Sequence, residues 1–151
     1  MARAARARRL RTMRTFDVVV VGGGPTGEEA AARVSDRGLS VALVEDRLVG
    51  GECGHWACIP SKALLRPPEV LAEAGRIRGA RESLNGGPNV AAVLARRDEV
   101  IGVDARTGEP DDAFLMPWVQ SHRIALVRGR GRLTGERHVT VGDEELRRVR
   151  R

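Results

Sequence analysis

Short aliphatic runs alternate with a glycine-bounded, alanine-rich segment near the start of the chain. Residues 16–21 (FDVVVV) predict a fully buried strand. Residues 28–37 are rich in alanine and end before Gly38, which predicts a helix. Residues 40–45 (SVALVE) predict a second strand. Strand, helix and strand fit into 30 residues, the size of one right-handed βαβ unit, so the pattern predicts an α/β fold.

Further along the chain the pattern changes from helical to extended. A helix is expected over 53–65, and Pro67-Pro68 should end it. The remaining segments with helical composition are 69–80 and 89–101, with a breaker at 85–88. Short strands separated by glycines are expected at 124–128, 131–134 and 138–141, and residues 144–151 are expected to form a strand or a linker.

Composition places the chain among soluble globular proteins. Its 151 residues are about one domain's worth, with 42% hydrophobic and 30% charged residues. No apolar run approaches the roughly 20 residues that span a bilayer, so the sequence predicts no membrane segment. No apolar region follows the N-terminal charges, which argues against a secretory signal and favours the cytoplasm.

The net charge of +6 comes from residues 1–14, which contain six arginines and no acid. The rest of the chain has 26 − 6 = 20 basic and 20 acidic residues and is formally neutral. We therefore expect residues 1–14 to be a disordered extension. Three origins remain open for it: an organellar transit peptide, a basic arm for nucleic acid, or an upstream start with Met13 as the true one. We favour the upstream start, and we expect no nucleic-acid partner.

A glycine motif lies between the first strand and the first helix. Gly22-Gly23-Gly24-Pro25-Thr26-Gly27 fits GxGxxG, and Glu45 follows 21 residues after Gly24 at the end of the second strand. In this motif Gly22 permits the tight turn, Gly24 lets the backbone approach a pyrophosphate, and Gly27 lets helix and strand pack closely. The helix N-terminus attracts phosphate, and Glu45 can accept hydrogen bonds from a ribose. The motif alone leaves FAD and NAD open.

The only two cysteines, Cys53 and Cys58, lie five positions apart in one predicted helix. Such positions point about 140° apart, so a disulfide between them requires an irregular first turn, which Gly54 would permit. The helix N-terminus is expected to lower a thiol pKa there. A zinc site including His55 and a pair of inert core cysteines are the alternatives. The spacing does not match a standard zinc pattern, and we expect no metal site.

Together these motifs resemble the pyridine nucleotide–disulfide oxidoreductase family. The resemblance rests on the GxGxxG turn, the acid ending the second strand, and the run from Gly50 to Lys62 (GGECGHWACIPSK), and it extends over residues 16–141. It implies a three-layer, Rossmann-like FAD-binding domain. It also implies a flavin-dependent NAD(P)H:disulfide oxidoreductase, similar to dihydrolipoamide dehydrogenase, glutathione reductase and mercuric reductase.

The resemblance also assigns roles to residues. Cys58 would be the thiol next to the flavin, Cys53 the interchange thiol that attacks the substrate, and Lys62 a cation near the reactive flavin nitrogen. The backbone at Gly50 and Gly51 would pass close to FAD. The expected FAD-binding residues are Gly22, Gly24, Pro25, Thr26, Gly27, Glu45, Gly50, Gly51, Lys62 and, on a weaker match, Gly131.

Family members often have threonine where Glu52 stands, and a small or apolar tetrapeptide where Gly54–Ala57 stand. These departures leave the disulfide substrate, a small molecule or a protein, open. Residues 15–151 would be the N-terminal part of the FAD-binding domain, without the NAD(P)H-binding and dimerisation domains that make full-length members homodimers. The alternative is a catalytically incompetent nucleotide-binding remnant, or a subunit that needs a separately encoded remainder.

Overall fold

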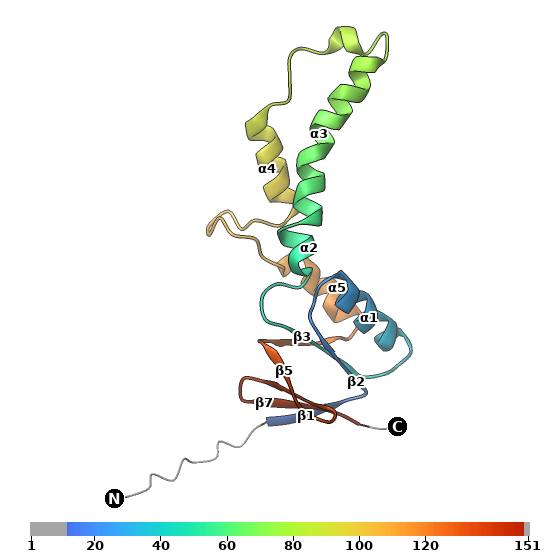
Figure 1. The fold of residues 1–151 in the computed structure, drawn as a ribbon, viewed down its shortest axis with the longest axis vertical. Coiled ribbons are helices and arrows are strands. Elements are labelled where there is room, and N and C mark those ends of the chain that lie inside the picture. The colour runs from blue at the N-terminus through green and yellow to red at the C-terminus, as the bar shows by residue number, and fades with distance from the viewer. Residues whose placement is uncertain (1–11, 150–151) are drawn as a thin grey trace, which may run out of the picture. The chain divides into compact units, whose positions relative to one another are not determined.

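A computed structural model describes residues 12–149, which divide into two compact units (Figure 1). Among the described residues, the first unit consists of 12–47 together with 119–149, and the second is Leu48–Trp118. Most of the predicted arginine-rich extension, residues 1–11, lies outside the described residues. Its last three residues are not part of an extension, because they begin strand β1 (Thr12–Phe16).

The first unit contains the predicted βαβ element. Strands β2 (Val18–Val21), β3 (Val41–Glu45) and β4 (Ala125–Arg128) form a parallel sheet in the order β2-β3-β4. Helix α1 (Pro25–Asp36) connects the first two. It begins three residues earlier than predicted, because Pro25 lacks an N–H that the first helical turn leaves unpaired in any case. The α/β prediction is confirmed.

A second sheet in this unit has the order β1-β7-β6-β5, formed with β5 (Gly131–Gly135), β6 (His138–Val141) and β7 (Glu144–Arg148). β1 pairs with β7 in parallel, and the other pairs are antiparallel. The single strand predicted over 16–21 is therefore divided. The division falls at Asp17, whose carboxylate accepts hydrogen bonds from the Ser40 N–H (2.9 Å) and hydroxyl (2.6 Å).

The core of the first unit lies between these two sheets. One face of the parallel sheet packs on the second sheet through a cluster of buried side chains: Phe16, Ala42, Val44, Val127, Val139, Val141 and Leu146. The alternate residues Val41 and Leu43 are also fully buried, and α1 packs on β2 and β3 with Ala31 and Ala32 buried. The unit thus has three layers: a helix, a parallel sheet and a mixed sheet (Figure 1).

The second unit is helical. Its elements in chain order are α2 (Gly51–His55), α3 (Cys58–Arg76), the 3₁₀ turn η1 (Arg81–Ser83), α4 (Val90–Val100) and the 3₁₀ turn η2 (Ala113–Leu115). Helix α5 (Met116–Ser121) then leads back to the first unit. Asn89 caps α4 by accepting a hydrogen bond from the Ala92 N–H at 3.0 Å.

The prediction that Pro67-Pro68 ends a helix is wrong, since α3 continues through both prolines to Arg76. Pro67 has no N–H to donate to the carbonyl of Ala63, four residues earlier. That carbonyl instead accepts a hydrogen bond from Arg96 Nη1 of α4 at 3.2 Å. A side chain from the neighbouring helix thus satisfies the oxygen that the proline leaves unpaired.

Candidate functional site

The glycine turn has the backbone geometry that the motif predicts. Gly22 has φ +102°, in the left-handed region, and its N–H donates to the Val44 carbonyl at 2.8 Å. A Cβ on Gly27 would lie 1.9 Å from the Gly22 carbonyl oxygen, so only glycine fits there. A Cβ on Gly24 would meet no atom within 4 Å. The open space above Gly24 is where the motif predicts a pyrophosphate.

Glu45 closes the turn from the end of β3. Its carboxylate is buried and accepts two backbone hydrogen bonds, from Gly23 N–H and from Arg47 N–H, each at 2.7 Å. A carboxylate has about four acceptor positions, so two remain for a ribose diol. The structure therefore gives Glu45 a structural role that sequence reasoning missed, and leaves it able to fulfil the predicted one.

Gly131 has a packing role at the start of β5. A Cβ there would lie 3.0 Å from methyl groups of both Val21 and Val44, so the glycine lets β5 approach the parallel sheet closely. The adjacent turn carries a cavity of about 510 Å³ that is rich in arginine, lined by Arg128, Gly129, Arg130, Arg132, Thr140, Val141 and Gly142. The packing explains this glycine without reference to a cofactor.

The helix that carries the cysteines is interrupted between them. Cys53 lies in α2 and Cys58 is the first residue of α3, and the break falls at Trp56 and Ala57, where Ala57 has φ −127° and ψ −88°. Gly54, which was expected to supply the irregular turn, lies inside α2. An irregular segment does separate the cysteines, but it begins at Trp56, three residues after Cys53, rather than at Gly54, one residue after it.

Both cysteines are free thiols, and the Cys58 thiol affects the pKa of Cys53. Hydrogen bonding with the Cys58 thiol is the main reason why the pKa of Cys53 is raised above its ordinary value of 9.0, with burial contributing in the same direction. The ammonium of Lys62 lowers the same pKa, but less. The expectation that the helix N-terminus lowers the thiol pKa is therefore wrong for Cys53, because the neighbouring thiol outweighs it.

The turn before Cys53 is built by Gly50 and Gly51, both with positive φ (+99° and +57°). Gly51 N–H donates to the Leu48 carbonyl at 3.0 Å, and Gly54 N–H to the Gly50 carbonyl at 3.0 Å. A Cβ on Gly50 would lie 2.8 Å from His55 Nε2. The positive φ angles thus favour glycine at both positions, and the nearby imidazole leaves no room for a side chain at Gly50.

Lys62 is exposed one turn after Cys58 and lines a cavity of about 460 Å³ between α3 and α4. The cavity is lined by Ile59, Lys62, Ala63, Leu65, Arg66, Glu69, Arg96 and Val100. Three of these side chains are cationic and one is acidic. The cavity is therefore a basic cleft with an apolar floor in the unit that carries the cysteines.

The predicted site residues fall into two groups. The first unit brings together Gly22, Gly24, Pro25, Thr26, Gly27 and Glu45, and also contains Gly131. The second unit contains Gly50, Gly51, Cys53, Cys58 and Lys62. Within residues 12–149, no group of three or more His, Cys, Asp and Glu side chains is arranged to hold a metal ion. No helix of this described part has both the length and the apolar character of a membrane span.

Comparison with known proteins gives consistent results. The family model described as pyridine nucleotide-disulphide oxidoreductase matches residues 16–146. Dihydrolipoyl dehydrogenase of Rhizobium etli is 37% identical over 131 residues, and dihydrolipoyl dehydrogenase of Bacillus subtilis is 37% identical over 120. These matches cover 85% and 80% of this chain, but 26% and 24% of the relatives. The chain thus spans about a quarter of their length.

A solved structure has a similar fold. It is the Cu(II) complex of the HOCl-induced flavoprotein disulfide reductase RclA from Escherichia coli, with a TM-score of 0.62 at 19% identity. The match covers 89% of this chain and 27% of that chain. At this identity the similarity concerns the fold alone, and it supports the Rossmann-like α/β assignment.

Proposed function

This chain belongs to the pyridine nucleotide-disulphide oxidoreductase family, and from that premise we propose that it is the FAD-binding portion of an NAD(P)H:disulfide oxidoreductase that reacts through Cys53 and Cys58. The observation that carries the proposal is that the two cysteines, both free thiols, lie on either side of the break between α2 and α3, where the Cys58 thiol is the main influence on the pKa of Cys53. The break between the two helices thus places the two thiols near enough for one to affect the other.

The first unit supplies groups that fit the ADP part of FAD. The space above Gly24 is open, and the first N–H groups of α1, at Thr26 and Gly27, belong to the donors that an α-helix leaves unpaired. The carboxylate of Glu45 retains acceptor positions for a ribose. When bound, FAD would carry electrons from NAD(P)H to the cysteine pair.

The cysteines would perform the exchange with substrate. In the reduced pair, the Cys53 thiolate attacks one sulfur of the substrate disulfide, which forms a mixed disulfide and releases the other half of the substrate as a thiolate. Cys58 then attacks the Cys53 sulfur, forming the Cys53–Cys58 disulfide and releasing the second half. Two electrons pass from the two cysteines to the substrate, and the released thiolates take up protons from solvent.

Lys62 would stabilise negative charge near the bound cofactor, since it is an exposed cation one turn after Cys58. The proposed acceptor is a small-molecule or protein disulfide, and the proposed setting is the cytoplasm, with a homodimer for the full-length enzyme. The positive residues of the cavity beside Lys62 favour a substrate that carries negative charge.

One preparation tests both halves of the proposal. The purified chain should show a flavin absorption spectrum, release FAD on denaturation, and lose both thiols to an internal disulfide when treated with oxidised glutathione. Gly24→Val should weaken FAD binding by at least about tenfold while both thiols still react. Cys58→Ser should retain FAD but stop at a glutathione adduct on Cys53.

Gly87→Val is the matched control for the glycine variant, because a Cβ there also meets no atom within 4 Å and the position lies outside the glycine turn. Unchanged FAD affinity in Gly24→Val would contradict the phosphate site. The absence of a glutathione adduct on Cys53 in the Cys58→Ser variant would contradict the role assigned to Cys53. A chain without flavin would favour the alternative of a nucleotide-binding remnant or of a subunit that needs a separate remainder.

A further inference from the structure

The backbone of Val49, just before the double glycine, is held from two sides. Its N–H donates to Asp112 Oδ2 and its carbonyl accepts from His55 Nε2, both at 2.7 Å. Val49 is fully buried, and His55 and Asp112 are only 2% and 7% exposed. We propose that His55 and Asp112 are positioning residues that hold Cys53 in register with Cys58, a role that rests on the proposed disulfide exchange.

The imidazole of His55 acts through one nitrogen. A carbonyl oxygen can only accept, so Nε2 carries the hydrogen in the bond to Val49. Nδ1 is buried and has no hydrogen-bond partner among the described residues. The ring lies against Trp56 and Phe114, with centroid distances of 5.4 and 6.2 Å. This burial withdraws His55 from proton exchange with substrate and leaves the bond to Val49 as its polar contact.

An apolar side chain of the same size would fill this space without burying an unpaired Nδ1, so packing alone does not account for a histidine here. The glycine at position 50 supports this interpretation. Its missing Cβ would lie 2.8 Å from Nε2, so the turn leaves room for the imidazole to reach the Val49 carbonyl. The hydrogen bond from His55 to Val49 thus depends on the glycine at position 50.

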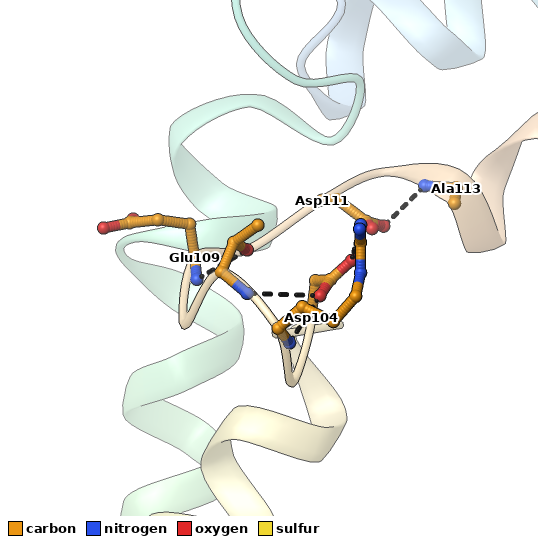
Figure 2. A network of polar contacts seen from close by, with 6 residues as sticks. Asp104, Glu109, Asp111 and Ala113 are labelled. Carbon is orange, nitrogen blue, oxygen red and sulfur yellow. Dashed lines mark hydrogen bonds and ion pairs between the residues drawn. The ribbon is translucent and has the colours of Figure 1, made fainter.

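Asp112 is presented by a loop with its own hydrogen-bond network (Figure 2). Asp104 accepts from the backbone N–H of Arg106 (2.7 Å) and Thr107 (3.3 Å). The Arg106 guanidinium also pairs with Asp104 at 3.1 Å. These bonds tighten the tip of the loop. The hydrogen bond from the Arg106 N–H is the main reason why the pKa of Asp104 lies below its ordinary value of 3.8.

The base of the same loop fixes the residues on both sides of Asp112. Asp111 N–H donates to the Gly102 carbonyl at 3.0 Å, and Asp111 Oδ1 accepts from Ala113 N–H at 2.8 Å, as Figure 2 shows for the second bond. An isolated bridge between Val103 and Pro110 closes the two arms. Asp112 is therefore held on a closed loop, and it accepts a hydrogen bond from the N–H of Val49, 63 residues earlier in the chain.

The two bonds to Val49 act on the cysteines through α2. Val49 precedes Gly50, the N-cap of this five-residue helix, and His55 is its last residue. The hydrogen bond from the His55 side chain to the Val49 carbonyl thus ties the last residue of α2 to the segment just before the helix. Cys53 lies inside this closed turn, and Cys58 follows three residues after His55. Opening the turn would let Cys53 sample positions away from Cys58 and lower their effective concentration.

The test is the thiol–disulfide equilibrium of the full chain in glutathione redox buffers. Methionine and glutamine are nearly equal in length, but only glutamine carries an N–H that can replace Nε2–H. His55→Met should lower the equilibrium constant for the Cys53–Cys58 disulfide by about tenfold, and His55→Gln should restore it to within about threefold. Asp112→Ala should lower this equilibrium constant as His55→Met does. Asp112→Asn keeps an acceptor oxygen, so its equilibrium constant should stay close to that of the original chain.

Equal effects of His55→Met and His55→Gln would overturn the proposal, since they would show that the side chain only fills space. An unchanged equilibrium in His55→Met would overturn it as well. If His55→Met does not fold, the pair Asp112→Ala and Asp112→Asn decides the question in the same way. Failure of the original chain to form the disulfide would instead overturn the proposed function, which distinguishes the two failures.

Discussion

At the scale of single residues, the chemistry of Cys53 is governed by its neighbours. The hydrogen bond with the Cys58 side chain raises its pKa, and Lys62 lowers it. A raised pKa reduces the fraction of thiolate at neutral pH, and the thiolate is the species that attacks a disulfide. The reduced pair is therefore expected to react faster as the pH rises toward the pKa of Cys53.

Two substitutions should move this pKa in opposite directions. Cys58→Ala removes the largest cause of the increase and should shift the pH profile of Cys53 alkylation to lower pH. Lys62→Gln removes the favourable charge and should shift it to higher pH. The profile can be measured as the rate of iodoacetamide modification of the Cys53 peptide by mass spectrometry. Shifts of the same sign in both variants would contradict this account.

The sequence predicted the backbone geometry of the glycine turn, because that geometry depends on near neighbours in the chain. Gly22, Gly27 and Glu45 belong to one short motif, and the structure gives each the expected position. His55 and Asp112 were not predicted as a pair, because their shared contact, Val49, lies far from Asp112 in sequence. A lone aspartate in a polar loop carries no signal of a buried N–H 63 residues away.

At the scale of elements, α3 continues through two prolines because α4 lies beside it. Arg96→Met should leave the Ala63 carbonyl unsatisfied and lower the free energy of unfolding by about 1–3 kcal/mol. Pro67→Ala restores an N–H at the right position in the helix. The cost of Arg96→Met should therefore shrink in the Pro67→Ala background, which a double-mutant cycle in urea can measure.

An equal cost of Arg96→Met in both backgrounds would mean that Arg96 acts through packing rather than through the Ala63 carbonyl. The same contact explains why the local pattern predicted the wrong end for this helix. A proline removes a hydrogen bond wherever it stands, but whether the helix ends there depends on the surroundings. The donor is Arg96, 33 residues further along the chain, and no local pattern identifies it.

At the scale of the whole molecule, Leu146 is a residue on which the core of the first unit depends. It is fully buried on β7, in the cluster between the two sheets. Leu146→Ala should lower the free energy of unfolding by about 2–5 kcal/mol. Leu133→Ala on β5 is the matched control, since that side chain is 83% exposed and should cost under about 0.5 kcal/mol. Equal urea unfolding midpoints for Leu146→Ala and Leu133→Ala would contradict the larger cost expected for Leu146→Ala.

The α/β class and the order of strand, helix and strand were predicted, because they depend on local apolar patterns and on one glycine motif. The pairing of β1 with β7 was not, because residues 12–14 belong by composition to the arginine-rich segment. Arg14 nevertheless has a specific partner, the Glu144 carboxylate at 3.0 Å. An arginine with a partner 130 residues away looks the same in sequence as one in a basic tail.

The pairing of β1 with β7 has a consequence for synthesis on the ribosome. β1 is synthesised before its partner strand, which follows about 130 residues later. At usual rates of translation this interval is on the order of ten seconds. During that time Phe16, which ends β1, lacks Leu146, its companion in the core between the sheets. The nascent chain therefore presents an unpaired strand and an uncovered aromatic side chain, a state in which chaperones would bind it.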